Sequence, residues 1–326
     1  MIAIIILNWN GWRDTNECIK SILKINDIEL SIIVVDNGST DNSTEQIITF
    51  TSKQNTRLFC LNEDERLTEK IQNKDVVLLK LRQNYGFAKG NNLGLKMLAG
   101  QQIDYYWILN NDTVVDNNSI DVLKTFMENN NYDACTPQIR FYSPNNRIWN
   151  CGGKLLWGFR KYYFAGKESV TFKKDFFDIT FVTGCALFIK PDILDENNCL
   201  FTEKFFFGEE DFEFSLRMKS NKKRIACCTK SIIYHKVSAS TKRQPKLGKI
   251  YIYYLNRFIN VKHFFSNWQY GLWRLINNIY ITMLLLKNGY NISNIKVFLK
   301  KLNKESLTLD EVSKETFERN INSFLS

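Results

Sequence analysis

One carboxylate and two amides stand together in the run Asn110-Asn111-Asp112, directly after the apolar segment 105–109. A buried strand would deliver these side chains to its carboxyl end. Hard oxygen ligands of this kind suit Mg²⁺ or Mn²⁺ bridging a diphosphate. Asn and Asp also form ordinary polar turns, so a turn before the next helix is the alternative. We expect a divalent metal near Asp112.

A second group of carboxylates, Glu209-Glu210-Asp211, follows the aromatic run 205–207 and opens an amphipathic segment that predicts a helix. Acids are favoured in the first turn of a helix by its dipole, so helix capping is one interpretation. Packed against aromatic rings, a carboxylate could instead have a raised pKa and take a proton from a hydroxyl group. The second interpretation makes this run a candidate general base.

Three further features could complete a ligand site. Asp36 follows an apolar segment and could accept hydrogen bonds from a nucleobase or a ribose, or only form a turn. The Gly- and Asn-rich segment 84–92 would let a backbone approach a phosphate at a helix N-terminus, with Lys89 adding charge, although a loop and helix cap would look similar. His235, one of two histidines, is either structural or a metal ligand.

The elements that must position these residues alternate between strand and helix. Apolar runs predict strands at 2–7, 30–35, 76–81 and 105–109, and helices are predicted at 14–24 and 86–99. This alternation is typical of a mostly parallel sheet, in which ligands bind beyond the carboxyl ends of the strands. We therefore expect the polar clusters that follow the strands to converge on one edge. They lie at residues 8–10, 36–41, 84–92 and 110–112.

The rest of the chain is less regular. Residues 53–75 read as a charged, irregular insertion, and residues 132–190 as strands and loops laid over the sheet edge. From residue 246 onward the pattern is helical and rich in aromatic and basic residues. We expect a catalytic domain at 1–245, with a nucleotide-binding half at about 1–115 and an acceptor half at about 116–245. A helical extension would occupy 246–326.

Composition narrows the classes of protein. The 326 residues carry a net charge of +10, which suits an anionic partner. No nucleic-acid-binding module appears, so no nucleic-acid partner is expected. Eight cysteines without a C-x-x-C pair indicate reduced thiols in a cytoplasmic enzyme. The short apolar run at the N-terminus predicts a strand and not a signal peptide, and no stretch is long enough for a transmembrane helix.

The joint order of the motifs resembles that of family 2 glycosyltransferases with the GT-A fold. The subgroup that the chain most resembles includes bacterial rhamnosyltransferases and related enzymes of cell-surface polysaccharide synthesis. The matching runs are Leu7 to Gly11, Val35 to Asp41, Asn84 to Gly94, Leu109 to Asp112 and Thr183 to Ile189, with Glu210-Asp211 before Arg217 and His235 before Ser238 and Ser240.

The resemblance implies an α/β fold with a mostly parallel Rossmann-like sheet covered by helices on both faces. It also implies a nucleoside-diphosphate sugar as donor. Asn8 and Asp36 would lie against the nucleobase and ribose, and the segment 84–92 would line the sugar and diphosphate. The donor-binding residues expected in this way are Asn8, Asn10, Asp36, Asn84, Gly86, Lys89, Asn92 and Asn111.

The same resemblance assigns the metal and the base. Asp112 matches the last acid of the D-x-D metal motif, with Asn110 where the first acid often stands, and His235 matches a second ligand for Mg²⁺ or Mn²⁺. Asp211 matches the catalytic base, with Glu210 as its neighbour. We expect in-line displacement that inverts the anomeric carbon. A nucleotidyltransferase and a non-catalytic sugar-binding protein are the alternatives.

The acceptor is expected to be a saccharide or a lipid-linked saccharide. The aromatic and basic C-terminal helices could simply pack on the catalytic domain, or lie on an anionic membrane surface. The enzyme would be cytoplasmic, and in the second case it would be peripheral on the inner face of the membrane. The polar stretch 306–326 suggests a peripheral arm or a contact in a homo-oligomer.

Overall fold

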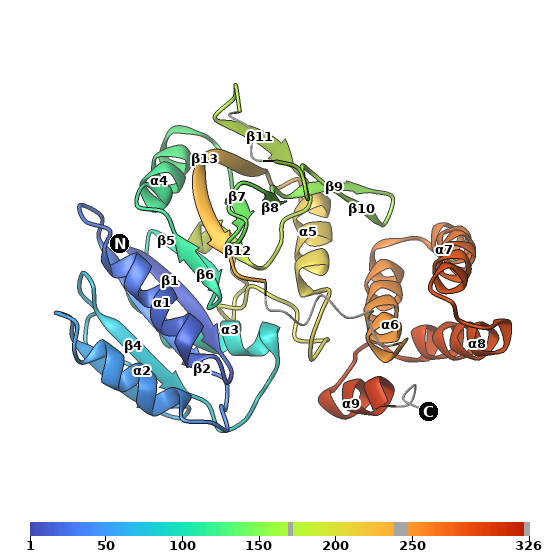
Figure 1. Cartoon of the computed structure of the whole chain (residues 1–326), viewed down its shortest axis with the longest axis horizontal. Coiled ribbons are helices and arrows are strands. Elements are labelled where there is room, and N and C mark those ends of the chain that lie inside the picture. Colours follow the sequence, from blue (N-terminus) through green and yellow to red (C-terminus); the bar gives the residue numbers. More distant parts are fainter. Residues whose placement is uncertain (169–171, 238–246, 323–326) are drawn as a thin grey trace.

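A computed structural model of the chain describes residues 1–168, 172–237 and 247–322. Ser238 and Ser240 therefore lie outside the described residues. The centre of the molecule is a mixed sheet (Figure 1). Its first half consists of parallel strands, which are β1 (Ile2–Asn8), β2 (Leu30–Asp36), β3 (Leu58–Asn62), β4 (Val76–Lys80) and β5 (Tyr105–Asn110). The predicted strands are confirmed. The predicted irregular insertion is wrong at 58–62, where β3 pairs with β4 at the edge of the sheet.

Most strands of the second half of the sheet come from residues 132–190, the region predicted to lie over the sheet edge. They are β7 (Ala134–Phe141), β8 (Ile148–Asn150), β11 (Phe176–Ile179) and β12 (Ala186–Ile189), and they are joined by β6 (Thr113–Val115) and β13 (Ile225–His235) from outside that region. Because β12 pairs antiparallel with β5, these strands continue the sheet, so the prediction of an overlay is wrong. The full order is β11-β13-β7-β12-β5-β1-β2-β4-β3. A separate hairpin pairs β9 (Gly153–Leu156) with β10 (Phe159–Tyr162).

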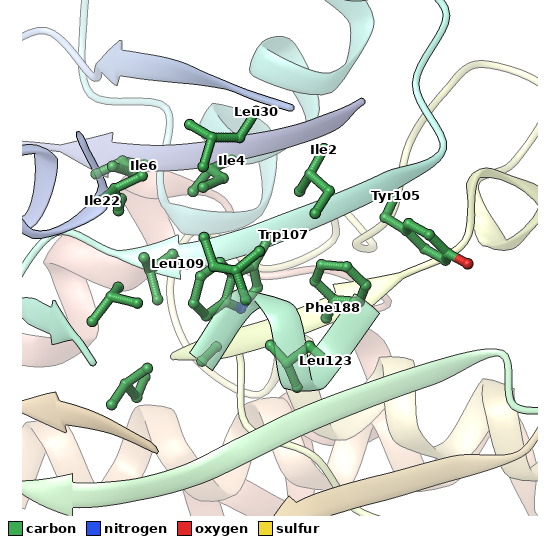
Figure 2. Packing of buried hydrophobic residues seen from close by; sticks show 14 of the residues in the cluster. Ile2, Ile4, Ile6, Ile22, Leu30, Tyr105, Trp107, Leu109, Leu123 and Phe188 are labelled. Carbon is green, nitrogen blue, oxygen red and sulfur yellow. The ribbon is translucent and has the colours of Figure 1, made fainter. Parts of the chain in front are cut away.

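Helices cover both faces of this sheet. On one face lie α1 (Trp12–Leu23), α2 (Ser43–Thr51) and α4 (Ser119–Asn129), and on the other α3 (Phe87–Met97) and α5 (Glu210–Ser220). Successive strand side chains point to opposite faces, so a strand buried on both faces is apolar throughout. Figure 2 shows Ile2, Ile4 and Ile6 of β1 in the same cluster as Ile22 of α1 and Leu123 of α4.

Four C-terminal helices stand beside the sheet domain in Figure 1 and confirm the predicted helical extension. They are α6 (Leu247–Phe264), α7 (Asn267–Lys287), α8 (Ile292–Thr308) and α9 (Lys314–Asn322); a short 3₁₀ turn, η1 (Pro191–Ile193), lies earlier in the chain. A third apolar cluster joins them to the rest, because Phe205 and Phe212 pack in it with Phe258 and Trp273. This core crosses the boundary that the sequence predicts at residue 245.

The cysteines and helices can be compared with the predictions of reduced thiols and of no transmembrane helix. All eight cysteines are free thiols, and six of them are buried. Within the described residues, no helix is both long and apolar enough to cross a bilayer.

Candidate active site

The loops after β1 and β2 are tied together by Asn8 and Asp36. Asn8 is fully buried, and its Nδ2 donates to Asp36 Oδ1 at 2.9 Å and to Ser39 Oγ at 3.1 Å. The Asp36 carboxylate also accepts hydrogen bonds from the hydroxyls of Ser39 and Thr44. In this structure both side chains therefore hold the backbone of the loops in place. Their predicted contact with a nucleobase or ribose stays a prediction.

Asn10 makes the outer connection between the same loops. Its Oδ1 accepts from the Thr40 N–H at 2.8 Å, and its own N–H donates to Ser39 Oγ at 2.9 Å. Asn10 has a φ of 52°, a left-handed conformation that Asn tolerates better than most residues. The loop after β1 is thus fixed on the loop after β2, at the carboxyl ends of two neighbouring parallel strands.

The segment before α3 joins this edge through Asn84 and Gly86. Asn84 Oδ1 accepts from Asn37 Nδ2 at 3.0 Å and from the Gly86 N–H at 2.8 Å. Gly86 has a φ of 86°, and a Cβ atom there would lie 1.9 Å from the carbonyl oxygen of Phe206. Glycine is required at this position because the loop before the acidic run passes directly against it.

Two other residues of the predicted donor segment point elsewhere. Asn92 is fully buried, and its amide accepts from the N–H groups of Leu200 and Phe201 and donates to Glu203. Asn92 therefore anchors the 200–203 segment and is not grouped with Asn84. The Lys89 ammonium lies 4.7 Å from the ring centroid of Tyr85. The donor-binding roles predicted for both residues remain untested.

The run after β5 divides its side chains between two neighbours. Asn111 Nδ2 donates to Thr15 Oγ1 at 3.0 Å, so this amide packs on the start of α1. Asp112 turns the other way, and its Oδ1 lies 3.0 Å from His235 Nε2 at the end of β13. The pairing of β6 with β13 brings these residues together, since Thr113 is in register with His235. Two predicted metal ligands, 123 positions apart, thus meet in the fold.

His235 lies in an enclosed setting. Its ring contacts Trp149 edge-on with centroids 4.4 Å apart, and the residue is 7% exposed. Burial lowers the pKa of His235, but the neighbouring Cys185 and Asp112 outweigh burial and raise it to about 10. We attribute the increase to Asp112, because burial also raises the pKa of the Cys185 thiol and keeps that thiol neutral.

The pair is compatible with a divalent metal. Asp112 offers a carboxylate oxygen and His235 a ring nitrogen. The 3.0 Å between them equals the spacing of adjacent ligands in an octahedral shell with bonds of about 2.1 Å. Within the described ranges, no group of three or more His, Cys, Asp or Glu side chains could hold a metal. A metal bound here would therefore need further ligands, such as diphosphate oxygens or water.

The dipeptide Gly184-Cys185 connects this pair with Asp211. A Cβ atom built on Gly184 would lie 3.9 Å from Asp211 Cβ, and the Cys185 side chain lies beside the His235 ring. Consecutive Cα atoms are only about 3.8 Å apart. The candidate base and the candidate metal ligands are therefore neighbours across one short segment. Thr183 to Ile189, the motif that contains this dipeptide, enters β12 at the middle of the sheet.

The two acids that begin α5 have different environments. Burial, together with the charge of Asp211, raises the pKa of Glu210 to about 8, and Glu210 Oε2 has no hydrogen-bond partner among the residues that the structure describes. Burial also raises the pKa of Asp211, but the charge of Arg160 opposes this increase. The Asp211 side chain is 22% exposed. At neutral pH Glu210 is mostly protonated. Asp211 is the better placed of the two to accept a proton.

Glu209 supports this pair together with two arginines, for which the sequence indicated no role in the site. Glu209 is 5% exposed with a φ of 70°, and its carboxylate is paired with both Arg257 of α6 and Arg160 of β10. Asn256 donates to the Phe207 and Gly208 carbonyls, and Asn260 donates to that of Glu209. Helix α6 thus holds the loop before the base. No local motif marks contacts that span about 50 residues of sequence.

A cavity of about 490 Å³ opens beside the Asn84 loop. One wall comes from the loops after the strands and includes Trp9 and Gly86. The other wall comes from the C-terminal helices and includes Lys249 of α6 and Lys314 of α9. Nothing in the sequence indicated that these lysines line a site, because they look like the other basic residues of the C-terminal helices.

A comparison with protein families identifies the family to which the chain belongs. Residues 3–197 match the model of glycosyl transferase family 2, which is more than half of the chain. The chain belongs to glycosyl transferase family 2. The predicted family is thereby confirmed, whereas the rhamnosyltransferase subgroup is not shown.

Similar proteins agree with this family. Glycosyltransferase GlyG of Streptococcus pneumoniae serotype 4 is 28% identical over 123 residues, which are 38% of this chain and 34% of that protein. The chain thus matches about a third of the length of this relative.

Solved structures show the fold. GalNAc-T7 with UDP, GalNAc and Mn²⁺ aligns with a TM-score of 0.58 and 14% identity, over 93% of this chain and 54% of the other. S. aureus TarS 1-349 with UDP-GlcNAc aligns with 0.52 and 15%, over 79% and 66%. The mannosyltransferase PcManGT of Pyrobaculum calidifontis with GDP-Man and Mn²⁺ aligns with 0.51 and 13%, over 80% and 61%. The GT-A-like fold is confirmed.

Proposed function

We propose that this family 2 member transfers a sugar from a nucleoside-diphosphate sugar to a hydroxyl of a saccharide or lipid-linked saccharide. The observation that carries the proposal is the short distance between its candidate base and its candidate metal ligands. Gly184 lies next to the Asp211 side chain, and the next residue, Cys185, lies beside His235 of the Asp112 pair. A sugar transferase needs a base on the acceptor side and charge neutralisation at the leaving diphosphate within one site.

In the proposed mechanism Asp211 removes the proton from the acceptor hydroxyl while that oxygen attacks the anomeric carbon. A single displacement inverts the configuration of that carbon. Arg160, whose Nη1 lies 3.8 Å from Asp211 Oδ1, orients the Asp211 carboxylate. Asp112 and His235 would hold Mg²⁺ or Mn²⁺, which would stabilise the negative charge that develops on the nucleoside diphosphate.

The donor would bind along the loops after β1, β2 and β4. Asn10 and Asn84 shape these loops, and the cavity beside them carries Lys249 and Lys314, whose charge suits a phosphate. A UDP-hexose or dTDP-rhamnose is proposed as donor. Relatives of the same fold that have been solved with UDP-GlcNAc, or with UDP and GalNAc, support a uridine nucleotide. The free thiols support a cytoplasmic location.

A donor panel tests this function. The protein is incubated with UDP-, dTDP- and GDP-sugars and Mn²⁺, and release of the nucleoside diphosphate is measured with and without saccharide acceptors. We expect release from a small subset of donors and its loss with EDTA. Formation of pyrophosphate from nucleoside triphosphates would instead identify a nucleotidyltransferase. Binding of sugar without any turnover would identify a sugar-binding protein.

A further inference from the structure

Helix α7 exposes a continuous apolar stripe. Seven outward side chains recur along the helix so that, at 100° per residue, they share an arc of about 100°. They are Trp268, Leu272, Leu275, Ile276, Ile279, Met283 and Leu286, each between 40% and 71% exposed. The opposite side of the same helix buries Tyr270, Trp273, Ile281 and Leu285 against its neighbours. An apolar helix of this kind is normally enclosed, so its outer face is expected to bind something.

The charge around the stripe indicates the partner. Residues 267–308, which comprise α7, α8 and their connection, contain six basic residues and one acid, Glu305. The basic residues are Arg274, Lys287, Lys296, Lys300, Lys301 and Lys304. The formal charge of this hairpin is therefore +5, half of the net charge of the whole chain. Lys296, Lys300 and Lys304 follow one another at four-residue intervals and are exposed along α8.

A second copy of the chain is a poorer partner than a lipid surface. In a twofold dimer the same patch meets itself, so the basic hairpin of one copy would approach that of the other. Glu305 could not neutralise them, because it supplies one negative charge against the six positive charges of the hairpin. An anionic bilayer would satisfy both, because its acyl chains would contact the apolar stripe and its headgroups would attract the basic residues of the hairpin.

We propose that α7 lies in the interface of an anionic bilayer, with its apolar stripe among the acyl chains and the lysines of α8 near the headgroups. This assigns a particular surface within the C-terminal extension. Tyr251, Tyr254 and Phe258, which also contribute to the aromatic character of the extension, are buried in its core. The 21-residue length of α7 gives a contact about 30 Å long.

Vesicle co-sedimentation of the full chain tests the proposal. Vesicles of phosphatidylcholine alone and of phosphatidylcholine with phosphatidylglycerol are compared at low and high salt. The variant Ile279→Glu places a charge in the middle of the stripe. Thr49→Glu, on the exposed side of α2, adds the same charge elsewhere. Both substitutions are at exposed positions, and equal thermal unfolding temperatures would confirm that both variants fold.

We expect binding to the anionic vesicles at low salt, weaker binding at high salt and little binding to neutral vesicles. Ile279→Glu should lower the affinity at least about tenfold, and Thr49→Glu should bind like the wild type. Absence of wild-type binding at low salt would overturn the proposal, as would equal binding by both variants. A dimer in solution that Ile279→Glu dissociates, without vesicle binding, would show that a second copy covers the stripe. None of these readouts requires sugar transfer, so they stand apart from the proposed function.

Discussion

The metal hypothesis depends on two side-chain atoms, Asp112 Oδ1 and His235 Nε2, which lie 3.0 Å apart. With only two protein ligands, loss of either should remove much of the metal affinity. We expect Asp112→Ala and His235→Ala each to weaken Mn²⁺-dependent binding of the nucleoside diphosphate by about 10–100-fold or more, measured by calorimetry. Asp116→Ala, a control at an exposed carboxylate a few residues away, should bind normally. Affinity that EDTA leaves unchanged would exclude the metal site.

The raised pKa of Glu210 predicts how the stability of the folded protein changes with pH. Burial raises its folded-state pKa from 4.5 to about 8, so the folded protein holds this proton more tightly than the unfolded chain does. The stabilisation by this proton is full below pH 4.5 and is lost as the pH rises through 8. Glu210→Gln removes this dependence. We expect the variant, relative to wild type, to gain several degrees in unfolding temperature between pH 5 and pH 8.5. A difference that is the same at both pH values would refute the assignment.

The loop before α3 and the loop before α5 pass close to each other at Gly86. Gly86 and Gly100 have the same φ of 86°, but a Cβ atom would meet the Phe206 carbonyl at Gly86 and nothing within 4 Å at Gly100. Gly100→Ala should therefore cost about 1 kcal/mol of unfolding free energy. Gly86→Ala should cost roughly 1–3 kcal/mol more, because backbone must move. Equal costs in denaturant unfolding would show that the contact is unimportant.

The parallel half of the fold could be predicted from sequence because its strands are apolar runs that end in polar turns. The pairing of Asp112 with His235 was available only through the family resemblance, since no local spacing relates β5 to β13. The prediction failed at β12, because a short buried strand looks like any apolar run and its antiparallel place beside β5 is set by long-range pairing.

The support of the base by α6 could not be predicted for a similar reason. Arg257 reads as one more basic residue in a basic region, and only the fold places it on the buried Glu209 carboxylate. A helix of the C-terminal extension thus positions the acidic run of the candidate active site.

For the whole molecule, the shared core predicts that the C-terminal helices are required for folding. A chain ending at residue 245 would expose Phe205 and Phe212, which pack against Phe258 and Trp273 in the full chain. We expect this shorter chain to aggregate or to unfold without cooperativity, as judged by size-exclusion chromatography and thermal unfolding. A chain ending at Val312, which lacks only α9 and the residues after it, serves as a control that keeps α6 to α8. Cooperative unfolding of the 1–245 chain would show that the catalytic domain folds independently.

Substitution of Asp211 tests the proposed transfer most directly. The measurement is turnover of the preferred donor and acceptor by Asp211→Asn, together with donor affinity by calorimetry on the same protein. We predict that turnover falls by about 10²–10⁴-fold, because the amide cannot accept the proton of the acceptor hydroxyl. Donor affinity should stay within about threefold of wild type. Turnover close to the wild-type rate with unchanged donor affinity would contradict the assignment of Asp211 as the base.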